Sequence, residues 1–269
     1  MIRKSRMRTP LLGAFIIIGS LPFASMLVFS MFARWPIDSL YPQNFTLDGF
    51  LYFFKRDFDI AVKTTWFSLV VSFLTLVLCI PAARGLLSMR RSVRKWIEPL
   101  FYFPMLLPVV SVSIGSHKLF LSLSMTGTVA VVLMHMYFVI PYIFQMVYSS
   151  HTVLGLSTET AAKNLGIGKW RIFFQIHLPI YLADYLSAYA MGFIISYSQY
   201  FVNFYLGGAD DINFSMIMTP LITGSNRNIA SVYTLMYLVF GSVVLFICSA
   251  IPRILHRKKG VCHGKYRDP

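Results

Sequence analysis

Apolar residues in this chain gather into six runs that are separated by polar residues, glycine and proline. The first run extends from Leu11 to about Ala33, and its 23 positions would span roughly 34 Å as a helix, enough to cross the hydrocarbon core of a bilayer. The other runs cover residues 66–83, 99–123, 128–148, 182–206 and 229–252. The pattern predicts an all-α polytopic membrane protein with six transmembrane helices.

Two of these runs need comment. A cleaved signal peptide is the alternative for the first run, but its apolar region would have only about 7 to 15 residues and would end at a small-residue cleavage site, so we expect a retained anchor. The third run carries Pro99, Pro104 and Pro108 in its first half. Proline lacks an N–H and bends or breaks a helix, so we expect this span not to be straight.

Composition and charge fit this class. The chain is 57% hydrophobic and 13% charged, with a mean hydropathy of +0.65, which is too apolar for a soluble domain of 269 residues. Of the 24 Lys and Arg residues, 18 lie on the side of both chain ends and of segments 84–98 and 157–180. Cytoplasmic loops hold the excess of positive charge, so we expect both termini to be cytoplasmic. Attraction to anionic membrane lipid accounts for the basic tail, and no nucleic acid is needed as a partner.

The longest polar interruption with a regular pattern is segment 157–180. Ser157 can cap a helix that has Glu159 in its first turn, and Gly166 is a natural stop for that helix. Three aromatic residues then fall at i, i+3 and i+4, so their rings should share one face of a second short helix: Trp170, Phe173 and Phe174. We expect Leu178-Pro179 to close the segment, which has the pattern of a docking element.

The spacing Thr160-Ala161-Ala162-x3-Gly166-x9-Ile176-x-Leu178-Pro179 resembles a known signature. The membrane subunits of binding-protein-dependent ATP-binding-cassette (ABC) importers carry Glu-Ala-Ala-x3-Gly-x9-Ile-x-Leu-Pro in a cytoplasmic loop. Six positions match over twenty residues; Thr160 stands where the family has glutamate, and an acid comes one residue earlier. An unrelated amphipathic loop is the alternative, but it predicts no particular spacing.

This resemblance implies the fold and the partners. We expect a type I ABC importer permease of the polyamine, iron, thiamine or phosphonate-like group, in a bacterial inner membrane. The implied partners are cytoplasmic ATP-binding subunits, a second permease subunit that is a different chain or a copy of this one, and an extracytoplasmic solute-binding protein. ATP and Mg are expected on the ATPase partner, with no cofactor on this chain. The implied ATPase-coupling residues are Glu159, Thr160, Ala161, Ala162, Gly166, Trp170, Phe173, Leu178 and Pro179.

The resemblance also implies a division of the chain. Residues 1–59 would form a cytoplasmic segment, the first helix and an outer loop, residues 60–252 a five-helix permease core, and residues 253–269 a basic cytoplasmic tail. Within the outer loop, residues 45–54 resemble the short amphipathic segment that many of these permeases place before the second span. An aromatic belt at the lipid headgroups is the alternative for that segment.

A polar cluster, residues 196–203, interrupts the fifth run. Polar side chains are costly against lipid, so we expect them to face a polar interior. The candidate residues for one wall of a solute pathway are Tyr197, Gln199, Tyr200 and Asn203. Hydrogen bonding between helices is the alternative role for the same residues.

The sequence contains no catalytic or metal-binding pattern that we can identify. It has no Gly-x4-Gly-Lys-Ser/Thr phosphate loop, no His-Glu-x-x-His, no nucleophile elbow and no acidic pair within a run. The three cysteines have no paired spacing. We therefore expect a transport subunit and not an enzyme. A self-sufficient secondary transporter or channel is the alternative; it would need ionisable groups at mid-membrane or an internal repeat, and we find neither.

Overall fold

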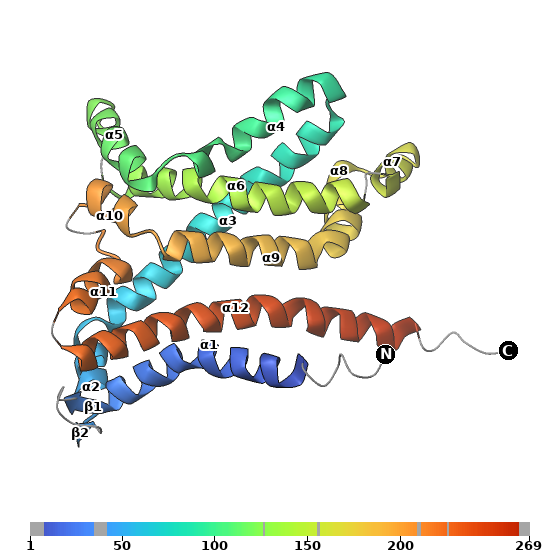
Figure 1. The fold of residues 1–269 in the computed structure, drawn as a ribbon. Helices are drawn as coiled ribbons and strands as arrows, with labels where there is room; N and C mark the ends of the chain where they lie inside the picture. Colours follow the sequence, from blue (N-terminus) through green and yellow to red (C-terminus); the bar gives the residue numbers. More distant parts are fainter. Residues whose placement is uncertain are drawn as a thin grey trace. The chain divides into compact units, whose positions relative to one another are not determined.

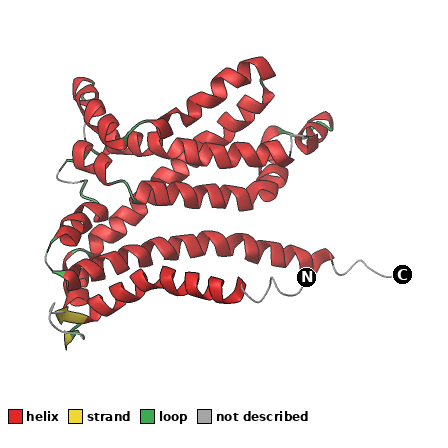
Figure 2. Cartoon of the chain, in the orientation of Figure 1, coloured by secondary structure: helices red, strands yellow, loops and turns green. Residues whose placement is uncertain are grey.

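The computed structural model describes residues 8–34, 42–125, 127–154, 157–208, 211–224 and 226–263, without the side chains of residues 8–12, 14, 34, 154, 157–159 and 255–263. Helices dominate these ranges (Figures 1 and 2). In chain order the elements are α1 (Arg8–Met31), β1 (Phe32–Arg34), β2 (Gln43–Phe45), α2 (Asp48–Arg56), α3 (Phe58–Ser88), α4 (Arg91–Leu106), α5 (Val109–Ser122), α6 (Thr128–Leu154), α7 (Ser157–Asn164), α8 (Lys169–Ile172), the π-helical turn η1 (Phe173–His177), α9 (Leu178–Tyr197), α10 (Tyr200–Leu206), α11 (Phe214–Thr223) and α12 (Arg227–His263).

Four helical segments of the described chain are long and apolar enough to cross a membrane. They are Phe58–Ser88, Thr128–Val153, Lys169–Tyr197 and Arg227–Ile254. The bent pair α4 and α5 makes a fifth candidate, and the apolar stretch described in α1 is shorter, Phe15–Met31. The chain is thus a multi-pass membrane protein, and the number of six spans stays a prediction.

The third predicted span is broken where its last proline lies. Helix α4 ends at Leu106, α5 begins at Val109, and their axes differ by 100°. Pro108 precedes the first residue of α5 in an extended conformation, where its missing N–H costs no helical hydrogen bond. Pro99 and Pro104 lie inside α4 without ending it. The expectation that this span is not straight is confirmed.

The predicted loop 84–98 is largely helical, which corrects the sequence-based boundary. Helix α3 continues to Ser88 and α4 begins at Arg91, so only two residues separate the helices. The basic residues in this segment did not end the helices because long cationic side chains on an exposed helix face remain solvated.

The chain divides into two compact units. The first comprises Met1–Ala61 and Met216–Val239, and the second comprises Val62–Ser215 and Phe240–Pro269. The boundary expected between residues 59 and 60 lies inside α3, which begins at Phe58.

One buried amide organises the first unit. Asn228 of α12 donates from its side-chain nitrogen to the carbonyl oxygens of Phe29, Ser30 and Phe32, at 3.0 to 3.1 Å. These carbonyls lie at the end of α1 and the start of β1, where the helix leaves acceptors without an intrahelical donor. Strand β1 continues into an antiparallel pair with β2, in which Phe32 faces Phe45.

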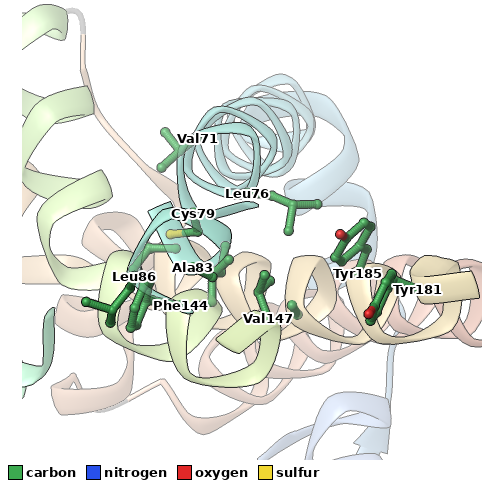
Figure 3. Close-up of a cluster of buried hydrophobic side chains, with 12 residues drawn as sticks. Val71, Leu76, Cys79, Ala83, Leu86, Phe144, Val147, Tyr181 and Tyr185 are labelled. Carbon is green, nitrogen blue, oxygen red and sulfur yellow. The ribbon is translucent and has the colours of Figure 1, made fainter. Parts of the chain in front are cut away.

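The second unit is built around α6 and α9, which lie side by side (Figure 1). Phe101 of α4 stacks on Phe144 of α6 with ring centroids 3.8 Å apart. Helices α3, α6 and α9 together supply one cluster of buried side chains (Figure 3): Val71, Leu76, Cys79, Ala83, Leu86, Val139, Ile143, Phe144, Val147, Tyr181, Tyr185 and Ala188.

Gly192 marks the closest approach of α9 to α6. A Cβ atom built on this glycine would lie 2.4 and 2.9 Å from two carbons of Ile143 and 3.1 Å from Val139. Both neighbours are fully buried, so a Cβ here would have to displace the Ile143 side chain within a packed interior. Helix packing rather than backbone conformation therefore favours glycine at this position.

We predict that Gly192→Ala lowers the stability of the second unit by about 1 to 3 kcal/mol, because the added carbon overpacks a filled helix interface. The measurement is thermal unfolding of the purified protein in detergent. Gly85→Ala is the matched control, since a Cβ on that glycine of α3 would meet nothing within 4 Å. Equal midpoints for the two variants would show that the helices do not pack this closely.

Candidate functional site

Helix α7 ends in a turn that depends on glycine. Gly166 has a φ of +75°, a left-handed conformation that side chains with a Cβ rarely adopt. Its N–H donates to the carbonyl of Lys163 at 3.0 Å, and the N–H of Ile167 donates to the carbonyl of Ala162 at 3.2 Å. These two bonds form a Schellman motif, which satisfies carbonyls at the helix end. The predicted helix stop at Gly166 is confirmed.

The segment after this turn differs from the prediction. Residues from Lys169 to Tyr197 form one continuous helix of 29 residues, so Leu178-Pro179 does not close a second short helix. Pro179 lies in the first turn of α9, directly after η1, in which the N–H of Leu178 donates to the carbonyl of Phe173. The wider π-helical turn accommodates the proline, which would clash with the preceding turn of a regular α-helix. Local sequence did not reveal this adjustment.

The predicted coupling residues fall into an exposed group and a packed group. Thr160, Ala161, Gly166 and Trp170 are exposed, Ala162 is buried, and Phe173, Leu178 and Pro179 are half-buried. Glu159 lies in α7, and its side chain is outside the described residues. Leu165, which was not among the predicted coupling residues, is 79% exposed, about as much as Trp170 at 78%. Large exposed apolar side chains at a polar turn are typical of a protein contact.

The three aromatic residues after the turn share a face, as predicted. The rings of Trp170 and Phe174 stack with centroids 6.2 Å apart, and Phe173 meets Phe174 edge-on at 5.1 Å. Phe173 also stacks on His177 at 5.7 Å, which connects the exposed face to the protein interior.

A buried cluster of histidine and tyrosine lies behind η1. The Tyr185 hydroxyl is 2.9 Å from Nε2 of His151 and 3.0 Å from Nδ1 of His177. The Tyr181 ring lies against both imidazoles, with centroids 4.4 and 4.6 Å away. The cluster therefore ties α6, η1 and α9 together beside the candidate coupling loop. The cluster could not be predicted from the sequence, because nothing in the local pattern pairs residue 151 with residues 177 and 185.

A break near the other end of the long helix corrects the prediction of one span over 182–206. Helix α9 ends at Tyr197 and α10 begins at Tyr200. Asn213 donates from its side-chain nitrogen to the carbonyl of Gln199 at 2.7 Å, which satisfies an acceptor at the break. The polar cluster that interrupts the run in the sequence is thus the place where the helix itself is interrupted.

A polar network surrounds this break. His135 of α6 has its ring nitrogens 2.9 Å from the Ser196 hydroxyl and 2.7 Å from Oδ1 of Asn203. Asn203 in turn donates to the backbone carbonyl of Asp211 at 3.2 Å. His135, Ser196 and Asn203 are all buried. Hydrogen bonding between helices, the alternative role considered for the polar cluster, therefore applies to Asn203.

The four predicted pathway residues are largely shielded from solvent within the chain. Tyr197, Gln199 and Asn203 are buried, and Tyr200 is half-buried. Asn203 also lines a cavity of about 240 Å³. The other residues lining that cavity are Lys63, Thr64, Trp66, Phe67, Asp211, Ile212 and Asn213. A cation, a carboxylate and two amides border this space, so it suits a polar solute or water.

A second hollow of about 660 Å³ opens along α6 and α9. Its lining residues are Gln145, Met146, Ser149, Ser150, Val153 and Asp184. Ser150 donates to the Asp184 carboxylate at 2.9 Å, so the acid is hydrogen-bonded within the chain. This groove was not predicted from the sequence, although Gln145 near the end of the fourth run and Ser149 and Ser150 just after it were a signal for it.

Comparison with known sequences finds a family match. The family model described as "Binding-protein-dependent transport system inner membrane component" matches residues 75–261. One curated relative, the putative 2-aminoethylphosphonate transport system permease protein PhnV of Salmonella typhimurium, is 26% identical over 189 residues, which cover 69% of this chain and 71% of the relative.

Solved structures share the fold. A chain of a bacterial alginate ABC transporter, in complex with an alginate pentasaccharide-bound periplasmic protein, superposes with a TM-score of 0.65 at 15% identity, covering 94% of this chain and 96% of that chain. A chain of the MetNI methionine ABC transporter in an inward-facing conformation gives a TM-score of 0.58 at 14% identity, with coverage of 72% and 95%.

We predict that Asn203→Leu and His135→Leu each destabilise the second unit by about 1 to 3 kcal/mol, because each leaves a buried partner without its hydrogen bond. The stability lost in the double variant should be smaller than the sum of the losses in the two single variants, since the double variant removes both partners. Unfolding midpoints of the four proteins in detergent measure this coupling. Asn164→Leu, at an exposed asparagine of α7, is the control for the amide-to-leucine change. Strict additivity would contradict the network.

Proposed function

This chain belongs to the family of binding-protein-dependent transport system inner membrane components, and from that premise we propose how it works as the permease subunit of an ABC importer. It forms half of a solute pathway and is driven by a cytoplasmic ATPase through residues 157–180. One observation carries the proposal. A single helix, Lys169–Tyr197, begins within the candidate coupling loop and ends at the polar break. At 1.5 Å per residue this helix extends over roughly 43 Å, most of the thickness of a membrane.

The exposed face of the loop is the proposed ATPase contact. Thr160, Ala161 and Leu165 offer small and apolar side chains around a fixed turn, and Trp170 follows this turn at the start of the long helix. Burying a side chain such as Leu165 in a partner's groove would contribute about 1.5 to 3 kcal/mol. Glu159, at the start of α7, is proposed to supply the acid that the family has one residue later.

The remaining coupling residues hold the shape of the loop. Gly166 supports the Schellman turn, and Ala162 packs inside the chain. Phe173, Leu178 and Pro179 lie where the loop passes into the helix, half-buried beside the His151–Tyr185–His177 cluster. A force applied to α7 is therefore passed to α9 rather than absorbed by a flexible hinge.

The solute pathway is proposed to pass the broken end of this helix. Tyr197, Gln199, Tyr200 and Asn203 surround the break, and Asn203 borders the 240 Å³ cavity. Movement of α9 would change the position of these side chains, because Ser196 and Asn203 are hydrogen-bonded to the same histidine of α6. Transport and energy input are thereby connected through one helix.

The proposed function needs partner proteins. We propose that ATP and Mg bind to separate ATPase subunits, that a second permease subunit of a different or the same sequence completes the pathway, and that an extracytoplasmic solute-binding protein delivers the solute. The chain itself is proposed to hydrolyse nothing and to bind no cofactor. Both termini and the loop 157–180 lie in the cytoplasm under this proposal.

We predict that Leu165→Asp weakens the contact with the ATPase subunit by at least tenfold, since a charge would replace an apolar side chain that the contact buries. Co-purification from mild detergent and ATP-dependent uptake by the complex measure the effect. Val93→Asp is the matched control, because Val93 is an exposed apolar residue of α4, outside the loop 157–180.

Leu165→Asp should weaken the ATPase contact without unfolding the loop, whereas Ala162→Asp should do both. Ala162 is only 4% exposed, so this variant is expected to disturb the loop itself and to lower thermal stability as well as coupling. Full ATPase retention and normal transport in Leu165→Asp would remove the loop from its proposed role.

We predict the orientation from the charge distribution. In a background without native cysteines, Lys163→Cys should react with a membrane-impermeant thiol reagent only in inside-out vesicles, and Gln43→Cys only in intact spheroplasts. Lys163 and Gln43 are both exposed in the chain. The reverse labelling pattern would place the loop 157–180 on the outer side, where no ATPase could reach it.

A further inference from the structure

A groove on the second unit lies where α3 meets the start of the long helix. It has a volume of about 560 Å³. Its lining residues are Val77, Ile80, Pro81, Arg84, Lys169, Trp170 and Phe173. Three of these, Lys169, Trp170 and Phe173, also belong to the candidate coupling loop, but the α3 side of the groove has no part in the proposed function.

The groove is apolar along most of its length and basic at one end. Val77, Ile80 and Arg84 lie at i, i+3 and i+7 of α3, so they share one helix face over two turns, roughly 10 Å. Arg84 is near the end of α3 at Ser88, while Val77 lies deeper in the apolar run. Lys169 begins α8. Two cations therefore stand on the edge of the membrane-spanning region, and the apolar part extends inward from them.

The apolar walls are uncovered by the chain itself. Val77 is 49% exposed and Trp170 is 78% exposed. Tryptophan is enriched at the level of lipid headgroups, and basic pockets on the cytoplasmic side of membrane proteins bind anionic headgroups. An amphiphile with a negative head and an apolar chain matches this arrangement, whereas a protein helix would have to supply acids at one end only.

We propose that this groove binds one anionic phospholipid of the leaflet that faces the coupling loop. The phosphate lies between Arg84 and Lys169, and an acyl chain follows Val77 and Ile80 with Trp170 and Phe173 on the other side. The bound lipid fills the space between α3 and the start of the long helix. It thereby supports the position of the loop, a role that goes beyond transport by the permease itself.

The test is binding of dioleoylphosphatidylglycerol to the delipidated, purified complex, followed by native mass spectrometry. Arg84→Gln/Lys169→Gln should weaken binding about tenfold or more, because both headgroup cations are removed. Arg91→Gln/Lys95→Gln is the matched control, with the same charge change at two exposed positions of α4. An equal loss of phospholipid binding in the two double variants would overturn the proposal, since the attraction of the lipid to the protein would then be unspecific.

Two further arms separate the lipid from other occupants. Val77→Trp fills the apolar part and keeps both cations, so it should also lose the phospholipid, and it changes an already exposed position, which limits the risk of misfolding. Glycerol phosphate, which has the charge but no acyl chain, should not compete; competition would make this a phosphate site and overturn the proposal. The Arg84→Gln/Lys169→Gln variant could instead lose the ATPase or the second permease subunit while its lipid binding stays unchanged. That result would assign the groove to the lost subunit and overturn the proposal.

Discussion

A backbone that leaves the regular α-helix inside a bilayer needs a partner within the protein for every N–H and C=O that it frees. Two departures from the regular α-helix lie along one helix of the second unit, the first within residues 157–180 and the second at the polar break. At Pro179 the N–H of Leu178 reaches the Phe173 carbonyl across a π-helical turn. At the break after Tyr197 the side chain of Asn213 takes up the carbonyl of Gln199. The long helix is continuous at the first place and interrupted at the second, and the proposed transmission of movement depends on that difference.

Buried polar clusters hold the same helix near both ends. Tyr185 bridges two imidazoles beside the coupling loop, and His135 bridges Ser196 and Asn203 beside the break. Between the clusters Gly192 lets α9 approach α6 without space for a methyl group. Tight packing with satisfied polar groups makes two helices move as one body. Under the proposed function, a displacement at α7 would reach the polar network through this pair of helices.

The sequence was most informative where one residue's own chemistry decides the structure. Gly166 ends α7 because of its backbone freedom, and Pro108 lies at the bend because it lacks an N–H. It failed where a distant partner decides. Leu178-Pro179 resembled a terminator because the π-helical turn that accommodates it is not visible in local spacing. The span over 182–206 resembled one helix because the amide that stabilises its break, Asn213, lies beyond the run. The cluster of His151, His177 and Tyr185 joins residues whose spacing carries no pattern.

The central claim is that energy enters from an ATPase through residues 157–180 and leaves as movement of α9 at the polar break. Proteoliposomes that contain the permease with its ATPase subunits and binding protein test it most directly, by uptake of the binding protein's solute with and without ATP. The account predicts uptake only when ATP, the ATPase and the loaded binding protein are all present. Uptake by the permease alone, driven by an ion gradient and independent of ATP, would contradict it.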